Sequence, residues 1–63
     1  MVTLDKEYME REGFHWEEPE DVISYIRNGI CFLEDTEGDE LLEEKRNRWK
    51  DCIIEAAACL DWE

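Results

Sequence analysis

The stretch DELLEEKRNRWKDCIIEAAACLDW, residues 39–62, decides the fold of this chain. Its apolar residues recur at the three- and four-residue spacing of one helix face, and lysines and arginines lie mostly beside that face. The residues on this face are Leu42, Trp49, Cys52, Ile53, Ala56, Cys59 and Leu60. The pattern predicts one long amphipathic helix that starts near Thr36 or Asp39 and runs almost to the C-terminus.

A second amphipathic stretch, PEDVISYIRNGICFL, occupies residues 19–33. Pro19 suits the first position of a helix, and the acidic residues around it suit the positive end of the helix dipole. Asn28-Gly29 could end the helix early and leave residues 30–33 as a short strand. A single glycine inside a helix costs only about 1 kcal/mol relative to alanine. Because no other segment offers a partner strand, we predict a continuous helix over residues 19–33.

The remaining segments complete an all-α fold of one domain, residues 1–63. Residues 3–12, TLDKEYMERE, predict a short N-terminal helix with Thr3 as its cap and Gly13 as its end. The short polar segment 34–38 joins the two longer helices, which should therefore form an antiparallel hairpin. We expect a short N-terminal helix packed with this helical hairpin.

The two predicted hairpin helices differ in length, which bears on assembly. Residues 19–33 span about 22 Å as a helix and residues 39–62 about 36 Å. The apolar C-terminal end should therefore overhang, covered either by the N-terminal segment or by a second chain. A chain of this size also buries little surface by itself. We predict a homodimer, a four-helix bundle of two hairpins. The candidate interface residues are Trp49, Ile53, Ala56, Leu60 and Trp62.

The charge balance excludes several kinds of partner. The chain has 19 acidic and 7 basic residues and a formal net charge of −12. Direct binding to nucleic acid or to an anionic membrane surface is disfavoured, because both depend on lysine and arginine. No apolar stretch approaches the ~20 residues of a membrane span, and the N-terminus lacks the pattern of a signal peptide. We expect a cytoplasmic protein.

The cysteines and the single histidine predict neither a metal site nor catalysis. On one helix, Cys52 and Cys59 would stand about 10.5 Å apart, too far to bridge or to share a zinc ion. We expect them and Cys31 to be reduced, buried thiols. His15 has no serine or cysteine beside it in sequence to activate. Residues 35–40 do not match a calcium loop, which would place Leu33 at its first ligand position. We predict no catalytic residue, no metal and no cofactor.

Acidic residues gather between and around the two predicted hairpin helices. Residues 1–44 hold 15 of the 19 acidic residues, so one end of the molecule should be intensely negative. Such a surface attracts basic partners. The candidate acidic surface comprises Glu34, Asp35, Glu37, Asp39, Glu40, Glu43 and Glu44.

The sequence EEPEDVISYIR at residues 17–27, together with the length, acidity and unpaired cysteines, resembles the small acidic accessory proteins of bacteriophages. It is most similar to the short open-reading-frame products that lambdoid phages carry between their recombination exonuclease and excisionase genes. The resemblance implies an all-helical, dimeric protein made early in infection in the bacterial host cell. It further implies that the protein modulates host or phage development through protein contacts, with no catalytic residues.

Two hypotheses about function follow. The first is a homodimeric regulatory protein that binds a host or phage protein. The second is an acidic DNA mimic, whose carboxylates imitate phosphates and block a nucleic-acid-binding protein. Binding by mimicry should collapse with added salt, because charge attraction is screened within about 8 Å at physiological ionic strength. An enzyme is the least favoured class.

Overall fold

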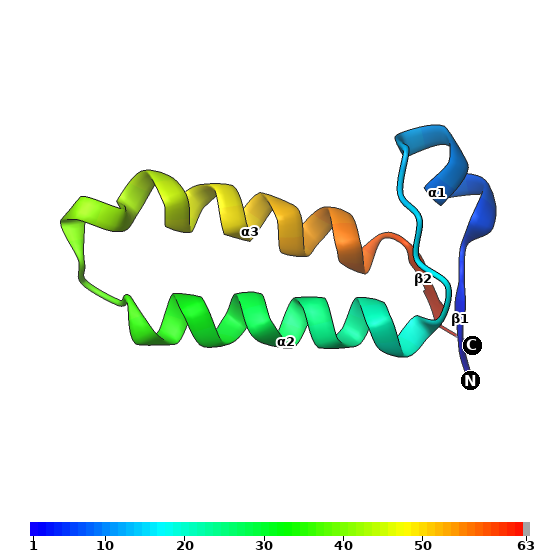
Figure 1. Cartoon of the computed structure of the whole chain (residues 1–63), viewed down its shortest axis with the longest axis horizontal. Helices are drawn as coiled ribbons and strands as arrows, with labels where there is room; N and C mark the ends of the chain where they lie inside the picture. Colours follow the sequence, from blue (N-terminus) through cyan, green and yellow to red (C-terminus); the bar gives the residue numbers. More distant parts are fainter. Residues whose placement is uncertain (63) are drawn as a thin grey trace.

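The computed structural model describes residues 1–62 as a long helical hairpin with a small cap at one end (Figure 1). Helices α2 (Pro19–Asp35) and α3 (Glu43–Ala57) run antiparallel, and the molecule measures 37 × 22 × 17 Å. Strands β1 (Val2–Leu4) and β2 (Leu60–Trp62) lie with the short helix α1 (Lys6–Glu12) at the end opposite the hairpin turn. The predicted helical hairpin is confirmed.

Helix α2 is continuous through Asn28-Gly29, so residues 30–33 are helix and not strand, as predicted. Gly29 is buried where α3 passes closest: a Cβ atom there would lie 2.8 Å from side-chain atoms of Trp49 and Ile53. The glycine therefore serves helix packing and does not end the helix. The close approach it allows offsets its low helix propensity.

Helix α3 is shorter than the sequence pattern predicts. A 3-10 turn, η1 (Glu40–Leu42), precedes it, and Asp39 caps this turn by accepting a hydrogen bond from the Leu41 amide at 3.0 Å. At the other end, α3 stops at Ala57, and residues 60–62 form β2. The prediction of one helix over residues 39–62 is therefore wrong at both ends. With 17 residues in α2 and 15 in α3, the hairpin helices match in length, and the predicted overhang does not occur.

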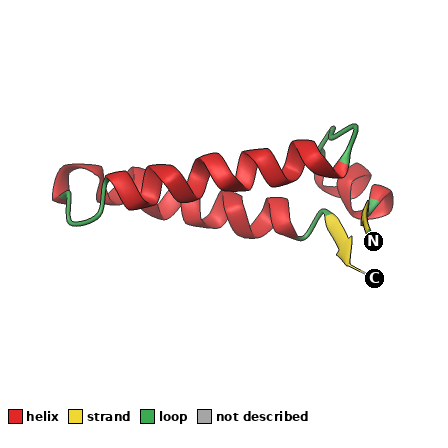
Figure 2. Cartoon of the chain, turned by 90° about the horizontal axis from the view of Figure 1, so that it is seen from below, coloured by secondary structure: helices red, strands yellow, loops and turns green. Residues whose placement is uncertain are grey.

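The two strands are the element that the all-α prediction misses. They pair antiparallel, with Val2 opposite Trp62 and Leu4 opposite Leu60, and the Asp5 amide donates to the Cys59 carbonyl at 2.7 Å. Each strand has only three residues, too few for a strand pattern to stand out. Of the two covers considered for the apolar C-terminal end, the N-terminal segment is the one observed (Figure 2).

Helix α1 starts later than predicted for the same reason. Because residues 2–4 pair with β2, the helix begins after Asp5, whose carboxylate accepts a hydrogen bond from the Tyr8 amide at 3.0 Å. Asp5 rather than Thr3 is therefore the N-cap. The helix ends at Glu12, before Gly13, as predicted.

The hydrophobic core lies near the chain ends. Val22, Ala56 and Leu60 form its buried centre, and residues of β1, α2 and the connection between α1 and α2 pack around them. Met9 and Cys59 are also buried. This small core joins α2, α3 and both strands within one chain. Association of two chains into a bundle stays a prediction.

Candidate functional site

The end of the hairpin opposite the core gathers the predicted acidic surface. We call residues 34–44 the turn end; it comprises the last residues of α2, the loop, η1 and the start of α3. All seven predicted acidic residues are exposed there: Glu34, Asp35, Glu37, Asp39, Glu40, Glu43 and Glu44. Within residues 1–62, the structure shows an ion pair between Arg11 and Glu12 and none with these seven carboxylates.

Polar interactions hold the turn end in shape. The Arg46 guanidinium reaches from α3 to donate to the Leu33 carbonyl, and also to Thr36 Oγ1 at 2.7 Å. Thr36 Oγ1 in turn donates to the Phe32 carbonyl at 2.6 Å. Gly38 adopts φ +82°, which lets the chain reverse without strain. Arg46 thus places a positive charge at the negative end of the α2 dipole and satisfies a terminal carbonyl.

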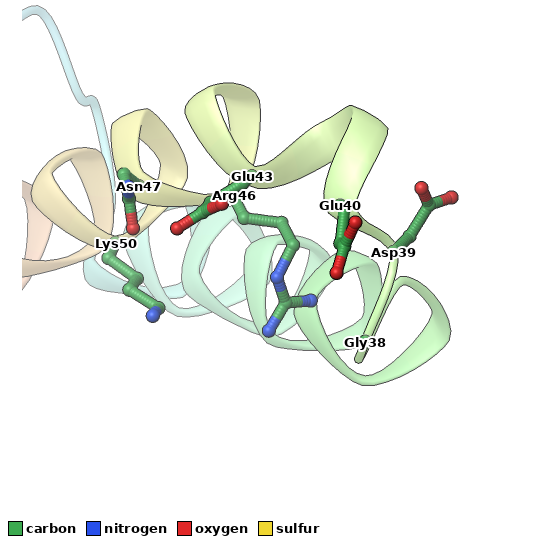
Figure 3. A pocket seen from close by; sticks show the side chains of 7 residues that line it. All are labelled: Gly38, Asp39, Glu40, Glu43, Arg46, Asn47 and Lys50. Carbon is green, nitrogen blue, oxygen red and sulfur yellow. The ribbon is translucent and has the colours of Figure 1, made fainter.

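A shallow hollow of about 350 Å³ opens beside this arginine (Figure 3). Figure 3 shows Arg46 reaching across the hollow, with the carboxylates of Glu40 and Glu43 on either side of it. The complete lining is Gly38, Asp39, Glu40, Glu43, Arg46, Asn47 and Lys50. The rim can accept hydrogen bonds from lysine or arginine side chains of a partner, because ionised carboxylates are strong acceptors.

The electrostatic effect of the acids differs between the two helices of the turn end. Glu43 and Glu44 lie in the first turn of α3, where the helix dipole favours negative charge. Glu34 and Asp35 lie at the C-terminus of α2, whose last turn has no basic residue. There the dipole is unfavourable for negative charge, while Arg46 places a positive charge at the same helix end. We expect a net cost to folding stability from these two carboxylates.

Leu41 lies between acidic residues in the sequence and is 94% exposed. It lines a shallow hollow together with Leu42, Glu44, Lys45 and Arg48. Residues Leu41 and Leu42 are adjacent, so only one of them can face the hairpin, and Leu42 is the half-buried one. The sequence pattern assigned Leu42 to the helix face but gave no role to Leu41. Its exposure was missed because a single leucine beside an amphipathic helix carries no distinct pattern.

The predicted interface residues are divided between two environments. Trp49 and Ile53 pack between the hairpin helices against Gly29, and Ala56 and Leu60 are buried in the core. Trp62 shares strand β2 with Leu60 but remains 67% exposed. Intrachain packing thus covers most of the surface that was expected to contact a second chain.

Other apolar side chains are exposed where the sequence pattern did not single them out. Ile54 is 67% exposed on α3, and Ile30 is 44% exposed on α2. Each comes directly after a more buried residue in the sequence: Ile30 after Gly29, and Ile54 after Ile53. Both therefore lie at the edge of an apolar helix face. Such single exposed residues carry no strong signal in a sequence.

The cysteines occupy three different environments. Cys59 is buried, Cys52 is half-buried and Cys31 is exposed, so the expectation that all three are buried is wrong. Cys31 lies on the face of α2 that points away from α3. Burial raises the pKa of the Cys59 thiol, and the nearby Trp16 indole opposes part of that rise. Within residues 1–62, no group of three or more histidine, cysteine or acidic side chains is placed to hold a metal ion.

Two tyrosines also titrate at higher pH than usual. The pKa of Tyr25 is raised by burial and by the neighbouring Cys52 thiol, and burial together with nearby Glu12 raises the pKa of Tyr8. His15 is exposed. Among the helices of residues 1–62, none has the length and apolar character needed to cross a membrane.

No protein-family model, curated protein or solved structure matches this chain. The chemistry of the turn end is therefore argued from its own residues.

Proposed function

We propose that this protein is a non-enzymatic regulatory protein that binds another protein through its turn end. The observation that carries the proposal is the exposed Leu41 side chain within a segment that carries seven exposed carboxylates, none of which forms an ion pair within residues 1–62. An exposed apolar side chain next to charged residues is typical of a protein contact surface. The acids attract and orient a basic partner, and burial of Leu41 supplies affinity that salt does not screen.

The resemblance of residues 17–27 to phage accessory proteins supports a setting for this activity. In that setting the chain is made by a phage or prophage, works in the cytoplasm of the bacterial host cell, and binds a host or phage protein. Its contact would modulate host or phage development. The charge of −12 supports a basic protein surface as the target rather than nucleic acid or membrane.

A DNA mimic is the second candidate, favoured by the density of negative charge along the molecule. A DNA duplex carries about one charge per 1.7 Å, so the 37 Å length corresponds to about 22 phosphates. The chain carries 19 acidic residues in total. In mimicry the acids along the whole molecule share the binding, and Leu41 contributes nothing. In the first proposal, binding depends on the turn end and on Leu41.

An affinity pull-down from bacterial lysate, read by mass spectrometry at low and high salt, separates the two functions. The baits are the unaltered protein, Leu41→Ser and Ile54→Ser, the last removing an exposed apolar side chain outside the turn end. Under the first proposal, a partner persists at about 0.5 M salt, where screening is strong. That partner is lost with Leu41→Ser and kept with Ile54→Ser.

Two charge variants complete the design. One neutralises Glu34, Asp35, Glu37 and Glu40, and its matched control neutralises Glu10, Glu17, Asp51 and Glu55, an equal loss of charge elsewhere. A partner lost only with the turn-end variant supports the first proposal. A basic nucleic-acid-binding protein captured only at low salt, and weakened equally by both charge variants, contradicts it and supports mimicry. The proposal also fails if Leu41→Ser retains every partner.

Homodimerisation is a separate part of the proposal. Exposed Ile30 and Trp62 give two chains apolar surface to share, although the core of each is closed within itself. Light scattering tests this without any partner. We expect the mass of two chains at high micromolar concentration, and a single-chain mass there would contradict the dimer while leaving the turn end as a binding surface.

A further inference from the structure

A second hollow, of about 200 Å³, opens between α2 and α3 and shares no residue with the turn-end hollow. Its lining comprises Tyr25, Lys45, Arg48, Trp49 and Cys52. Lys45, Arg48 and Cys52 follow one another at spacings of three and four residues, so they lie along one face of α3. This hollow is apolar between its walls and cationic at its rim.

Packed aromatic rings form the walls of this second hollow. The ring centroids of Tyr25 and Trp49 lie 5.4 Å apart, and those of Trp49 and Phe32 lie 6.1 Å apart. Trp16 continues the row, with its ring 5.2 Å from that of Tyr25. The Trp49 ring is held from behind by the close contact at Gly29. These mutual contacts fix the walls before any ligand arrives, which lowers the entropic cost of binding.

The rim carries positive charges that are not neutralised within the chain. Within residues 1–62, neither Lys45 nor Arg48 forms an ion pair, although the chain contains 19 acidic residues. The Lys45 ammonium instead lies 5.4 Å from the centroid of the Phe32 ring. Two cations one helical turn apart, at the edge of an aromatic hollow, complement a single anionic group that is joined to an apolar group.

The size and surroundings of the hollow restrict the ligand further. A volume of about 200 Å³ is below the roughly 300 Å³ at which small-molecule sites begin, so one amino-acid residue is the natural occupant. The exposed acids Glu44, Asp51 and Glu55 flank this face of α3 and repel a polyanion. A protein segment rich in acids and a nucleic-acid strand are therefore both disfavoured as ligands of this hollow. An isolated carboxylate can still reach the two cations.

We propose that this hollow binds the C-terminal residue of a partner protein when that residue is apolar. Its α-carboxylate accepts hydrogen bonds from Lys45 and Arg48, and its side chain packs on Tyr25 and Trp49. A chain terminus is the one place in a protein where a carboxylate and an apolar side chain belong to the same residue. The site does not include Leu41, although Lys45 and Arg48 also line a neighbouring hollow with that residue. The peptide titration and the Leu41→Ser pull-down test the two proposals separately.

Nuclear magnetic resonance titration of the isotopically labelled full chain tests the site. The probe is an N-acetylated tripeptide, Ser-Gly-Phe, with a free C-terminal carboxylate, and its control is the same peptide with a C-terminal amide. We expect saturable shifts of the Trp49 indole signal and of the amides of Tyr25, Lys45 and Arg48. The amidated peptide should bind about tenfold more weakly, because it lacks the charge-assisted hydrogen bonds.

Matched variants show whether the rim or the overall charge is responsible. Arg48→Gln should weaken the free-acid peptide about tenfold, and Arg48→Lys should retain most of its affinity. Arg27→Gln removes the same charge from an exposed position on α2 and should have no effect. Both positions are exposed on helices, and the dispersion of each variant's spectrum verifies folding.

Several results would overturn the assignment. These are an absence of saturable shifts, shifts centred on other residues, equal binding of the acid and the amide, or equal weakening by Arg48→Gln and Arg27→Gln. The assignment would also be overturned if a single-stranded oligonucleotide or an internal acidic peptide bound more tightly at the same residues. That molecule, and not a C-terminal residue, would then be the ligand. Pull-down results with Leu41→Ser are unaffected by any of these outcomes.

Discussion

The two ends of this hairpin are built on different physical principles. At the end that holds both termini, Val22, Ala56, Cys59 and Leu60 are buried, and β1 pairs with β2 over them. At the turn end, every residue from 34 to 44 is exposed or half-buried. Hydrogen bonds from Arg46 and Thr36 replace a core there. We call the first the terminal end.

This difference separates stability from function along the molecule. The terminal end concentrates apolar burial, which is the main favourable term in folding. The turn end contributes little burial and carries charges that repel one another, so it is free to present a surface to a partner. Substitutions at the terminal end should therefore change stability, and those at the turn end should change binding.

The largest expected effect is at the terminal end. Leu60→Ala should lower the free energy of unfolding by about 2–4 kcal/mol, because it removes a leucine that is only 7% exposed. Leu41→Ala is the matched control, since the same truncation at a side chain 94% exposed should change little. Urea denaturation followed by circular dichroism measures both. Equal losses would remove the distinction between the two ends.

The second-largest effect on stability is expected at the close contact between α2 and α3 at Gly29, which lies between the two ends. Gly29→Val should lower the free energy of unfolding by about 1–3 kcal/mol, because the added side chain meets Trp49 and Ile53. The control is Asn28→Val, at the preceding, exposed position on the same helix. The same denaturation measurement applies. If the two variants lose equal stability, helix propensity and not packing accounts for the loss.

A smaller effect is expected at the turn end itself. Arg46→Gln should lower the free energy of unfolding by about 1–2 kcal/mol, because the C-terminus of α2 loses a charged hydrogen-bond donor. Arg48→Gln, on the same helix but exposed, should change it by less than about 0.5 kcal/mol. Thermal unfolding of both variants checks this. A loss from Arg48→Gln as large as that from Arg46→Gln would show that overall charge matters more than the cap.

The pH dependence of stability should come from the terminal end. The folded-state pKa of Cys59 is raised above its ordinary 9.0, so its contribution is fully present below that pH. Above pH 9.0 the thiol of the unfolded chain ionises first, and the contribution is lost as pH rises through the folded-state pKa. Raised pKa values at Tyr8 and Tyr25 extend the fall above their ordinary 10.0.

Denaturation at a series of alkaline pH values checks this sign. Cys59→Ala should flatten the fall in stability that begins near pH 9.0, whereas Cys31→Ala, at an exposed cysteine, should leave the fall as it is. A stability that rises over this range, or an unchanged fall in Cys59→Ala, would contradict the burial of the thiol.

The amphipathic pattern predicted the hairpin well because the periodicity of its helices is a local property. Pro19, Gly13 and the stripe through Trp49 and Ala56 each act within one element, and the structure places them as expected. The pairing of Val2 with Trp62 joins the two ends of the chain. Nothing local to either three-residue strand signals it, so Leu60 and Trp62 were assigned to a helix.

The acidic surface could be predicted because charge gathered in a turn region stays at the surface in almost any fold. All seven acids are exposed at one end. The roles of Arg46 and Leu41 could not be predicted in the same way. Each depends on where η1 directs the chain, and therefore on a turn that periodicity does not describe.

The central claim is that Glu34 and Asp35 at the turn end serve binding at a cost in stability, and one comparison tests the stability part of it most directly. The double variant Glu34→Gln/Asp35→Asn removes carboxylates from the unfavourable end of α2, so the free energy of unfolding should rise by about 0.5–1 kcal/mol. Glu43→Gln/Glu44→Gln removes carboxylates from the favourable end of α3 and should lower it by a similar amount. If the first variant instead loses stability, these acids hold the fold together and the account is contradicted.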